Sequence, residues 1–214
     1  MESIISFFIY AITAIFVIVN PLNGILTFVS MTRGTTEKTK NVYAKKSAVL
    51  AAAIAIFFAI AGELVLSVMN ININSLKVAG GILLFYIGFN MTTAKTQTSV
   101  TKEEIDDAQE KDFWVFPIAI PLLCGPGTIS TVIILMGSTD LIINKALIIV
   151  AIIIVYSIVY VGLRFSRRIN DILGITGSMV IIRLLGLFLA AIAVGMITSG
   201  LHGIYLSFLE IDSS

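Results

Sequence analysis

The sequence predicts an all-α polytopic membrane protein with six transmembrane spans. Three observations support this fold class. Of the 214 residues, 57% are hydrophobic and only 13% are charged, whereas a soluble domain carries about twice that share of charge. The apolar residues fall in runs of roughly 20 or more, which is enough to cross a bilayer core. All four prolines lie in the first and fourth of these runs, which indicates that two spans are broken helices.

The six expected spans follow one another along the chain with one long polar stretch in the middle. They cover residues 4–30, 43–69, 74–92, 114–136, 141–163 and 177–200. Eleven of the 14 Lys and Arg residues lie in or next to the connections on one side of these spans, and two lie near the span ends on the other side. Since basic loops remain in the cytoplasm, we expect both termini to lie outside the cell.

The first span contains the helix-breaking sequence N-P-L-N-G at residues 20–24. Asparagine is a favoured N-cap and proline a favoured first helical residue, so a second half-helix is expected to start at Asn20 and Pro21. The first amides of a helix have no helical acceptor and point back toward its start. The amides expected to be free here are those of Leu22, Asn23 and Gly24.

The second span contains small residues at helical spacing, which predict close packing against a neighbouring helix. They are Ala48, Ala52, Ala55, Ala59 and Gly62. Glu63 borders this face, and ionisable residues inside spans are costly and often functional. Two roles are open for Glu63: a proton-coupling carboxylate, or a structural ion pair with Lys77 of the third span. We favour the ion pair.

Residues 96–112 join the two halves and contain six of the 13 acidic side chains. We interpret them as a solvated cytoplasmic linker, because their spacing fits no metal-binding loop. No metal site and no cofactor is expected beyond a coupling H⁺ or Na⁺. The formal net charge of +1 predicts no nucleic-acid partner, and the single cysteine, Cys124, allows no internal disulfide.

The fourth span contains the strongest break, P-I-A-I-P-L-L-C-G-P-G-T at residues 117–128. Prolines remove backbone donors and clash with the preceding turn, and glycines permit conformations that other residues avoid. A half-helix is expected to start at Gly125 and Pro126, as at Asn20 and Pro21. The amides expected to be free here are those of Gly127, Thr128 and Ile129.

The two halves of the chain resemble each other. Pro21 and Pro126 are 105 residues apart, and so are Gly81 and Gly186. Each half has three spans, so a duplicated unit would enter the membrane in the opposite direction, as in the inverted repeats of carriers. We therefore expect repeat 1 at residues 1–95 and repeat 2 at residues 113–214.

Two further charged residues each precede one of the paired glycines by about one turn. Lys77 precedes Gly81 near the outer end of its span, and Arg183 precedes Gly186 near the inner end. Both are expected on closely packed helix faces. Gating pairs at opposite mouths would have this placement, but interfacial snorkelling would also produce it, and we favour snorkelling.

The two breaks together predict a binding site near the middle of the membrane. The spans run in opposite directions, so the two half-helix starts are expected to meet there, each with about half a positive charge. Proline also leaves the carbonyls of Val17 and Leu122 without their helical donors, and these suit an ammonium group. Such a site fits a small zwitterion. The candidate substrate-binding residues are Asn20, Pro21, Asn23, Gly24, Gly125, Pro126, Gly127 and Thr128.

N-P-L-N-G in the first span and P-L-L-C-G-P-G-T in the fourth resemble motifs of the MarC family of bacterial and archaeal membrane proteins. This family is also called the neutral amino acid transporter family, with SnatA as its named transporter, and the resemblance covers the whole chain. It implies an inverted-repeat secondary transporter in a prokaryotic cell membrane. The implied substrates are small neutral amino acids such as glycine, alanine and serine, with coupling to protons or cations.

Other functions remain open at this stage. The same fold serves an exporter of amino acids or other small metabolites, because the gradient sets the net direction. A small-solute channel fits less well, because a channel needs a continuous polar lining. No enzyme is expected, since no span contains paired Asp residues or an H-E-x-x-H motif. Small-residue faces that remain free could support a homo-oligomer.

Overall fold

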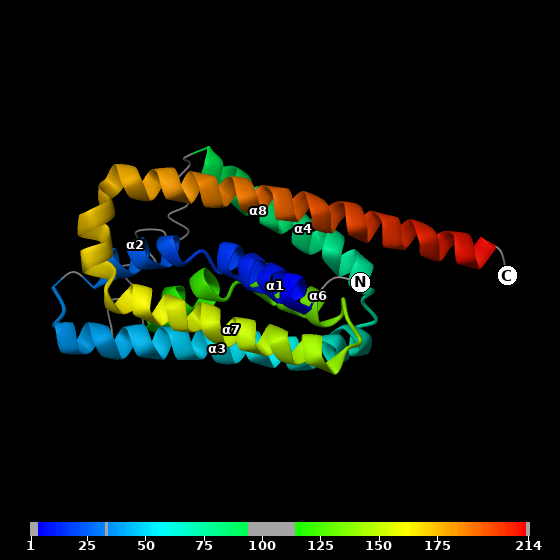
Figure 1. Cartoon of the computed structure of the whole chain (residues 1–214), viewed down its shortest axis with the longest axis horizontal. Coiled ribbons are helices and arrows are strands. Elements are labelled where there is room, and N and C mark those ends of the chain that lie inside the picture. The colour runs from blue at the N-terminus through cyan, green and yellow to red at the C-terminus, as the bar shows by residue number, and fades with distance from the viewer. Residues whose placement is uncertain (1–3, 33, 94–113, 213–214) are drawn as a thin grey trace.

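The computed structural model describes residues 4–32, 34–93 and 114–212, and these are almost entirely helical. The elements in chain order are α1 (Ile4–Val19), α2 (Pro21–Met31), α3 (Glu37–Val68), α4 (Ile73–Thr92), η1 (Trp114–Leu123), α6 (Pro126–Met136), α7 (Ile142–Arg164) and α8 (Ser166–Asp212). The predicted all-α class is therefore confirmed (Figure 1). The predicted acidic linker at 96–112 lies outside the described residues.

The described helices provide up to six membrane spans. Five stretches are long and apolar enough to cross a membrane: Ile4–Met31, Glu37–Val68, Ile73–Thr92, Ile142–Arg164 and Thr176–Leu209. The sixth is the pair η1 and α6, which bends by 51° at its break. These stretches agree with the predicted spans at most ends. The second begins at Glu37 instead of residue 43, and the last continues to Leu209 instead of ending near residue 200.

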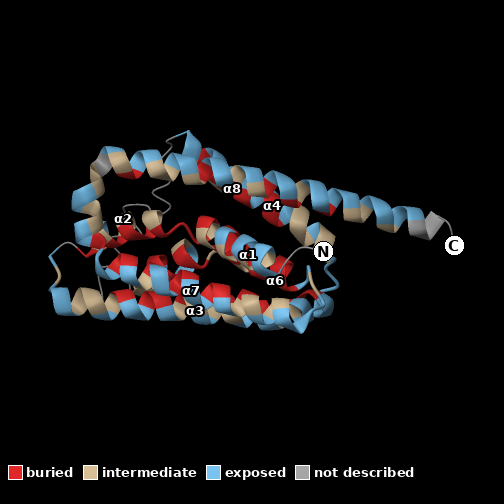
Figure 2. Cartoon of the chain, in the orientation of Figure 1, coloured by how far each residue is buried: buried red, intermediate tan, exposed pale blue. Residues whose placement is uncertain are grey.

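The core lies around α6, the half-helix that follows the second break. Nearly every residue of α6 is buried, including Gly127, Thr128 and the run from Ser130 to Met136. The inward faces of α1, α3 and α7 complete this core (Figure 2). Large apolar side chains cover the outer surface, such as Ile60 and Phe57 on α3. Apolar outer surfaces of this kind are what a helical bundle exposes to lipid.

Helices α4 and α8 lie side by side and approach closely through glycines. A methyl group placed on Gly88 would lie 2.6 Å from the carbonyl oxygen of Gly186, and one on Gly81 would lie 2.9 Å from that of Ala193. Gly81 and Gly186 therefore lie on closely packed helix faces. The stripe on α3 is confirmed, since Ala48, Ala55, Ala59 and Gly62 are buried and Ala52 is partly buried.

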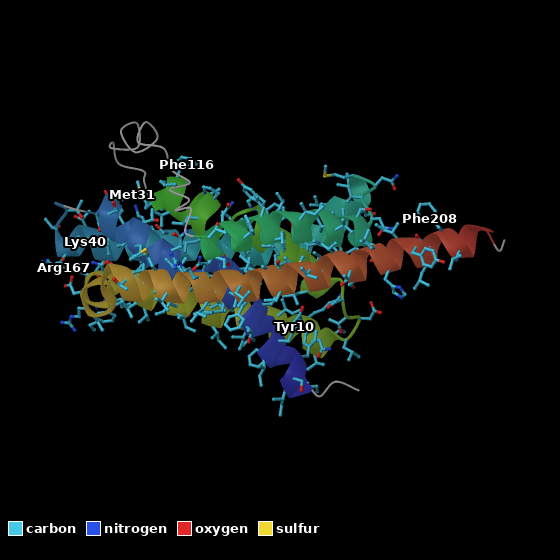
Figure 3. All side chains as sticks on the ribbon, turned by 90° about the horizontal axis from the view of Figure 1, so that it is seen from above. Tyr10, Met31, Lys40, Phe116, Arg167 and Phe208 are labelled. Atoms are coloured by element: carbon cyan, nitrogen blue, oxygen red, sulfur yellow. The ribbon has the colours of Figure 1, made fainter. Side chains whose placement is uncertain are left out.

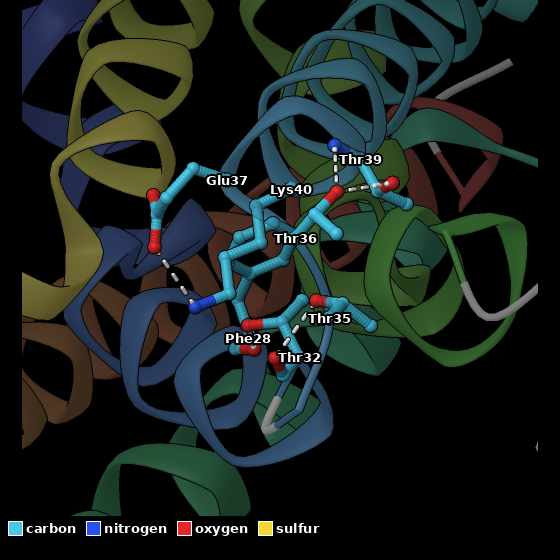
Figure 4. Close-up of polar contacts among 7 residues, drawn as sticks. All are labelled: Phe28, Thr32, Thr35, Thr36, Glu37, Thr39 and Lys40. Carbon is cyan, nitrogen blue, oxygen red and sulfur yellow. Dashed lines mark hydrogen bonds and ion pairs between the residues drawn. The ribbon is translucent and has the colours of Figure 1, made fainter.

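A threonine-rich turn reverses the chain between α2 and α3 (Figure 4). The Thr32 hydroxyl donates to the Phe28 carbonyl at 2.7 Å, and the Thr35 hydroxyl donates to the Thr32 carbonyl at 2.8 Å. Thr36 is the N-cap of α3, because its hydroxyl accepts a hydrogen bond from the Thr39 amide at 3.3 Å. These bonds satisfy groups that the two helix ends leave free.

Candidate binding site between two broken helices

The first break is a single residue, Asn20, between α1 and α2. Asn20 has φ 49° and ψ 67°, a left-handed conformation that Asn tolerates better than most residues. Its side-chain oxygen accepts a hydrogen bond from the Asn23 amide at 3.5 Å, and Pro21 is the first helical residue. The predicted N-cap and the predicted start of α2 are both found. Asn20 also donates through Nδ2 to the sulfur of Met91 on α4, at 3.4 Å.

The second break is longer and less regular. Phe116 and Ile120 have extended backbone angles inside η1, each directly before a proline. Gly125 is the N-cap of α6 with φ −96° and ψ −177°, and it provides no side-chain cap. Pro126 is the first helical residue of α6, as Pro21 is of α2. Both half-helices therefore start at the predicted residues.

The two breaks lie next to each other in the fold. A methyl group placed on Gly24 of α2 would lie 2.9 Å from Cδ2 of Leu123, at the end of η1. A methyl group placed on Gly127 of α6 would lie 3.8 Å from Ile18 at the end of α1, and 2.6 Å from Leu84 of α4. Residues about 100 positions apart in the sequence thus meet in one small region that contains Gly24 and Gly127.

The backbone amides at the two breaks differ from the prediction in part. The Asn23 and Gly24 amides both donate to the Asn20 carbonyl, at 3.1 and 3.4 Å, and the Ile129 amide donates to the Gly125 carbonyl at 3.0 Å. The expectation that these three amides are free was wrong, because an N-cap carbonyl accepts the first intrahelical bond. Within the described residues, no backbone acceptor is found for the amides of Leu22, Gly127 and Thr128.

Tyr156 of α7 contacts the second break and was not predicted. Its hydroxyl donates to the Leu123 carbonyl at 2.8 Å, and both residues are buried. This carbonyl lies at the end of the chain segment before the break, where helical donors are missing. Tyrosine is common in membrane spans and occurs here inside an apolar run, so the sequence contained no signal for this contact.

The charged residues singled out from the sequence lie away from the breaks. Glu63 contacts Lys145 of α7 at 3.6 Å, with side chains 51% and 31% exposed. The favoured ion pair between Glu63 and Lys77 was wrong: Lys77 instead donates to Asn74, one turn away on α4, at 3.4 Å. The ends of α3 and α7 meet at Glu63, whereas Lys77 lies on α4. Lys77 is partly buried on α4, but Arg183 is exposed on α8, so the expectation that Arg183 lies on a closely packed face was wrong.

No group of three or more His, Cys, Asp and Glu side chains that could hold a metal ion is found in the part of the chain that the structure describes. The buried polar atoms near the breaks are instead amide and hydroxyl groups. Asn90 Nδ2 on α4 and Thr131 Oγ1 on α6 are buried without a hydrogen-bond partner in the described structure. Unpaired buried polar groups are rare in native structures, so both atoms are available to a polar ligand.

Comparisons with known proteins agree on one family. The sequence pattern of the MarC family integral membrane protein matches residues 5–205. A UPF0056 membrane protein of Methanocaldococcus jannaschii is 36% identical over 200 residues, which cover 93% of this chain and 98% of that relative. The UPF0056 membrane protein YvbG of Bacillus subtilis is also 36% identical, over 94% of this chain and 96% of the relative. No solved structure matches the chain.

Proposed function

This chain belongs to the MarC family of integral membrane proteins, and from that premise we propose that it is a secondary active transporter of small neutral amino acids. Membership suggests a role in membrane transport, and the site geometry supports the substrate class. The site offers backbone groups rather than charged side chains at the two breaks. A small zwitterion, which carries one positive and one negative charge, fits such a site.

The observation that carries the proposal is the free start of α6. The amides of Gly127 and Thr128 have no acceptor in the described structure, and both residues are buried. A helix start has about half a unit of positive charge, and free amides at this end bind carboxylate or phosphate groups. The α-carboxylate of an amino acid is therefore proposed to bind at the start of α6.

The ammonium group of the substrate is proposed to bind backbone carbonyls at the ends of the preceding segments. Pro21 and Pro126 cannot donate to the carbonyls of Val17 and Leu122, and no described backbone group outside the helices donates to them. Gly24 and Gly127 contribute no side chain to the region between the breaks. The leucines around these glycines pack closely, since a methyl group on Gly24 would lie 2.9 Å from Leu123 and one on Gly127 would lie 2.6 Å from Leu84. We therefore propose that the substrate side chain is small, which favours glycine, alanine and serine.

The contacts between the two halves support an alternating-access carrier built as an inverted repeat. Ile133 of α6 contacts Gly62 on α3, and Ile25 of α2 contacts Gly162 on α7. The half-helix after each break thus packs on a glycine of the unbroken helix from the other half. Such reciprocal packing is expected of two related units that rock against each other around a fixed site.

The proposal also covers the coupling ion, the orientation of the chain in the membrane and the class of protein. We propose coupling to H⁺ or Na⁺, both termini outside the cell, and a carrier rather than an enzyme. Coupling or gating by Glu63, Lys77 and Arg183 is an alternative to the ion pairing and snorkelling favoured for these side chains. Export of amino acids by the same mechanism is the alternative, since the gradient sets direction. Saturable counterflow that distinguishes L- from D-alanine would separate a carrier from a channel.

A thermal-shift screen of the purified protein tests the substrate class. A ligand that binds only the folded state raises the unfolding temperature with its concentration relative to its dissociation constant. Glycine, alanine or serine is expected to raise it. Glycinamide, which lacks the carboxylate, and N-acetylglycine, which lacks the ammonium group, serve as matched controls and should give no shift. A shift with glycinamide equal to that with glycine would contradict the carboxylate site at α6.

A further inference from the structure

A short helical segment, residues 166–173 of α8, lies across one end of the bundle. It follows the end of α7 at Arg164, and Gly174 separates it from the long arm of α8 with φ 60° and ψ −176°. Figure 1 shows it in yellow and gold, running crosswise to both α7 and the rest of α8. Because α7 and Thr176–Leu209 are membrane spans, this crossing segment lies where both leave the hydrocarbon.

One face of the crossing segment, together with Phe165 directly before it, combines apolar and basic side chains. Phe165, Arg168 and Ile172 follow one another at spacings of three and four residues, so they share a helix face. Phe165 is 43% exposed and Ile172 is 82% exposed, whereas Ile169 packs against the hydrophobic core. The exposed face is therefore not needed for packing within this chain.

The arginines of this region gather around the same apolar side chain. The guanidinium carbons of Arg164 and Arg168 lie 5.9 and 5.8 Å from the Phe165 ring centre. Arg167 is also exposed, and Asp171 is the acidic residue nearby, which leaves the segment with a net positive charge. Figure 3 shows Arg167 at the same end of the molecule as Lys40 of α3.

We propose that the crossing segment lies in the membrane interface and binds the headgroups of anionic phospholipids. An interfacial helix buries apolar side chains at the boundary of the acyl chains and holds cationic side chains at the phosphates. Ile172 and Phe165 supply the first kind of contact, and Arg164, Arg167 and Arg168 supply the second. Clusters of basic side chains next to a transmembrane helix commonly bind the headgroups of anionic lipids. This inference does not depend on the proposed transport.

The test compares the protein in nanodiscs of phosphatidylcholine alone with nanodiscs that also contain phosphatidylglycerol. We expect phosphatidylglycerol to raise the unfolding temperature of the wild type by several degrees and to remain bound in native mass spectra. The variant R164Q/R167Q/R168Q should lose most of this rise. The matched control K38Q/K40Q/K45Q removes the same charge at the same end, from α3, and should keep the rise.

A second variant keeps the test decisive if the triple arginine variant does not fold. Ile172→Ser changes an exposed side chain and no charge. Because it weakens insertion of the segment, it should at least halve the rise and lower the unfolding temperature in phosphatidylcholine only slightly. Equal losses in the arginine and lysine variants would overturn the proposal, because they would indicate general attraction between charges. If the wild type unfolds at the same temperature in both kinds of nanodisc, the lipid proposal is also overturned. The exposed face would then be assigned to contact with a protein partner.

Discussion

The half-helices after the two breaks begin with the same residue type but are capped differently. Each break places a proline at the first position of a half-helix, after Asn20 in one case and Gly125 in the other. Asn20 caps its own half-helix through its side chain, and α1 and α2 together still pass as one span. Gly125 has no side chain to cap α6, and the chain bends there by 51°.

This difference indicates where a ligand has the most to contribute. At the first break, the protein itself supplies the acceptor for the Asn23 amide. At the second break, the amides of Gly127 and Thr128 have no such acceptor in the described structure. A buried unpaired amide costs about 1–3 kcal/mol, and a bound carboxylate removes that cost. We therefore expect the second break to dominate substrate affinity and the first break to dominate local stability.

Gly125→Ala is the largest expected perturbation of the second break. A methyl group at this position would lie 2.5 Å from the Pro121 carbonyl oxygen, which is backbone and cannot rotate away. We expect a loss of about 3 kcal/mol of unfolding free energy in detergent and loss of transport, because overpacking forces the backbone to move. Gly195→Ala is the control: nothing lies within 4 Å of that position, so alanine should be neutral or stabilising. Equal stability of both variants would contradict the close fit at Gly125.

Asn20→Ala tests the first break in the same way. Alanine removes the cap, which is worth about 1 kcal/mol, and places a methyl-bearing residue in a left-handed conformation at a cost of about 1 kcal/mol. We expect a total loss near 2 kcal/mol, measured by denaturant unfolding. Asn20→Gly keeps the left-handed conformation and should lose only a few tenths of a kcal/mol. If the alanine and glycine variants lose the same stability, the left-handed conformation of residue 20 does not explain why asparagine stabilises this position.

Tyr156→Phe affects only the second break. The change leaves the buried Leu123 carbonyl without its donor, and an unsatisfied buried acceptor costs about 1–3 kcal/mol. We expect about 1.5 kcal/mol of lost stability and a weaker substrate-induced thermal shift. Tyr160→Phe, one turn along α7, is the matched control, since its hydroxyl makes only an exposed 3.5 Å contact with Arg164. Equal effects at both tyrosines would argue against a specific role for the Leu123 contact.

The sequence predicted the helices and both breaks because proline and glycine act locally. A proline removes a donor and blocks the preceding turn whatever surrounds it, so Pro21 and Pro126 were sufficient to place the starts of α2 and α6. The small-residue faces were also predictable, since Gly81 and Gly186 have no side chain to separate α4 from α8. These features depend on residue type and spacing, which a single sequence contains.

The contacts that could not be predicted depend on which helices meet. Glu63 was assigned to Lys77, the nearest basic residue in the next span, but α3 meets α7 at this end and the contact is with Lys145. The Tyr156 contact with Leu123 joins positions 33 residues apart across two helices. Two apolar helices give no sequence signal for their partner, because lipid and protein surfaces are equally apolar.

The smallest expected effect comes from replacing one side chain at each break and comparing the two affinities. Asn23 and Thr128 are both the third residue of their half-helix and lie 105 residues apart. If the substrate carboxylate binds mainly at the start of α6, Thr128→Val should weaken the affinity about fivefold, the value of one neutral hydrogen bond of about 1 kcal/mol. Asn23→Leu should change it less than twofold. Titration of each variant with alanine by thermal shift measures both, and the reverse order would move the carboxylate to the first break.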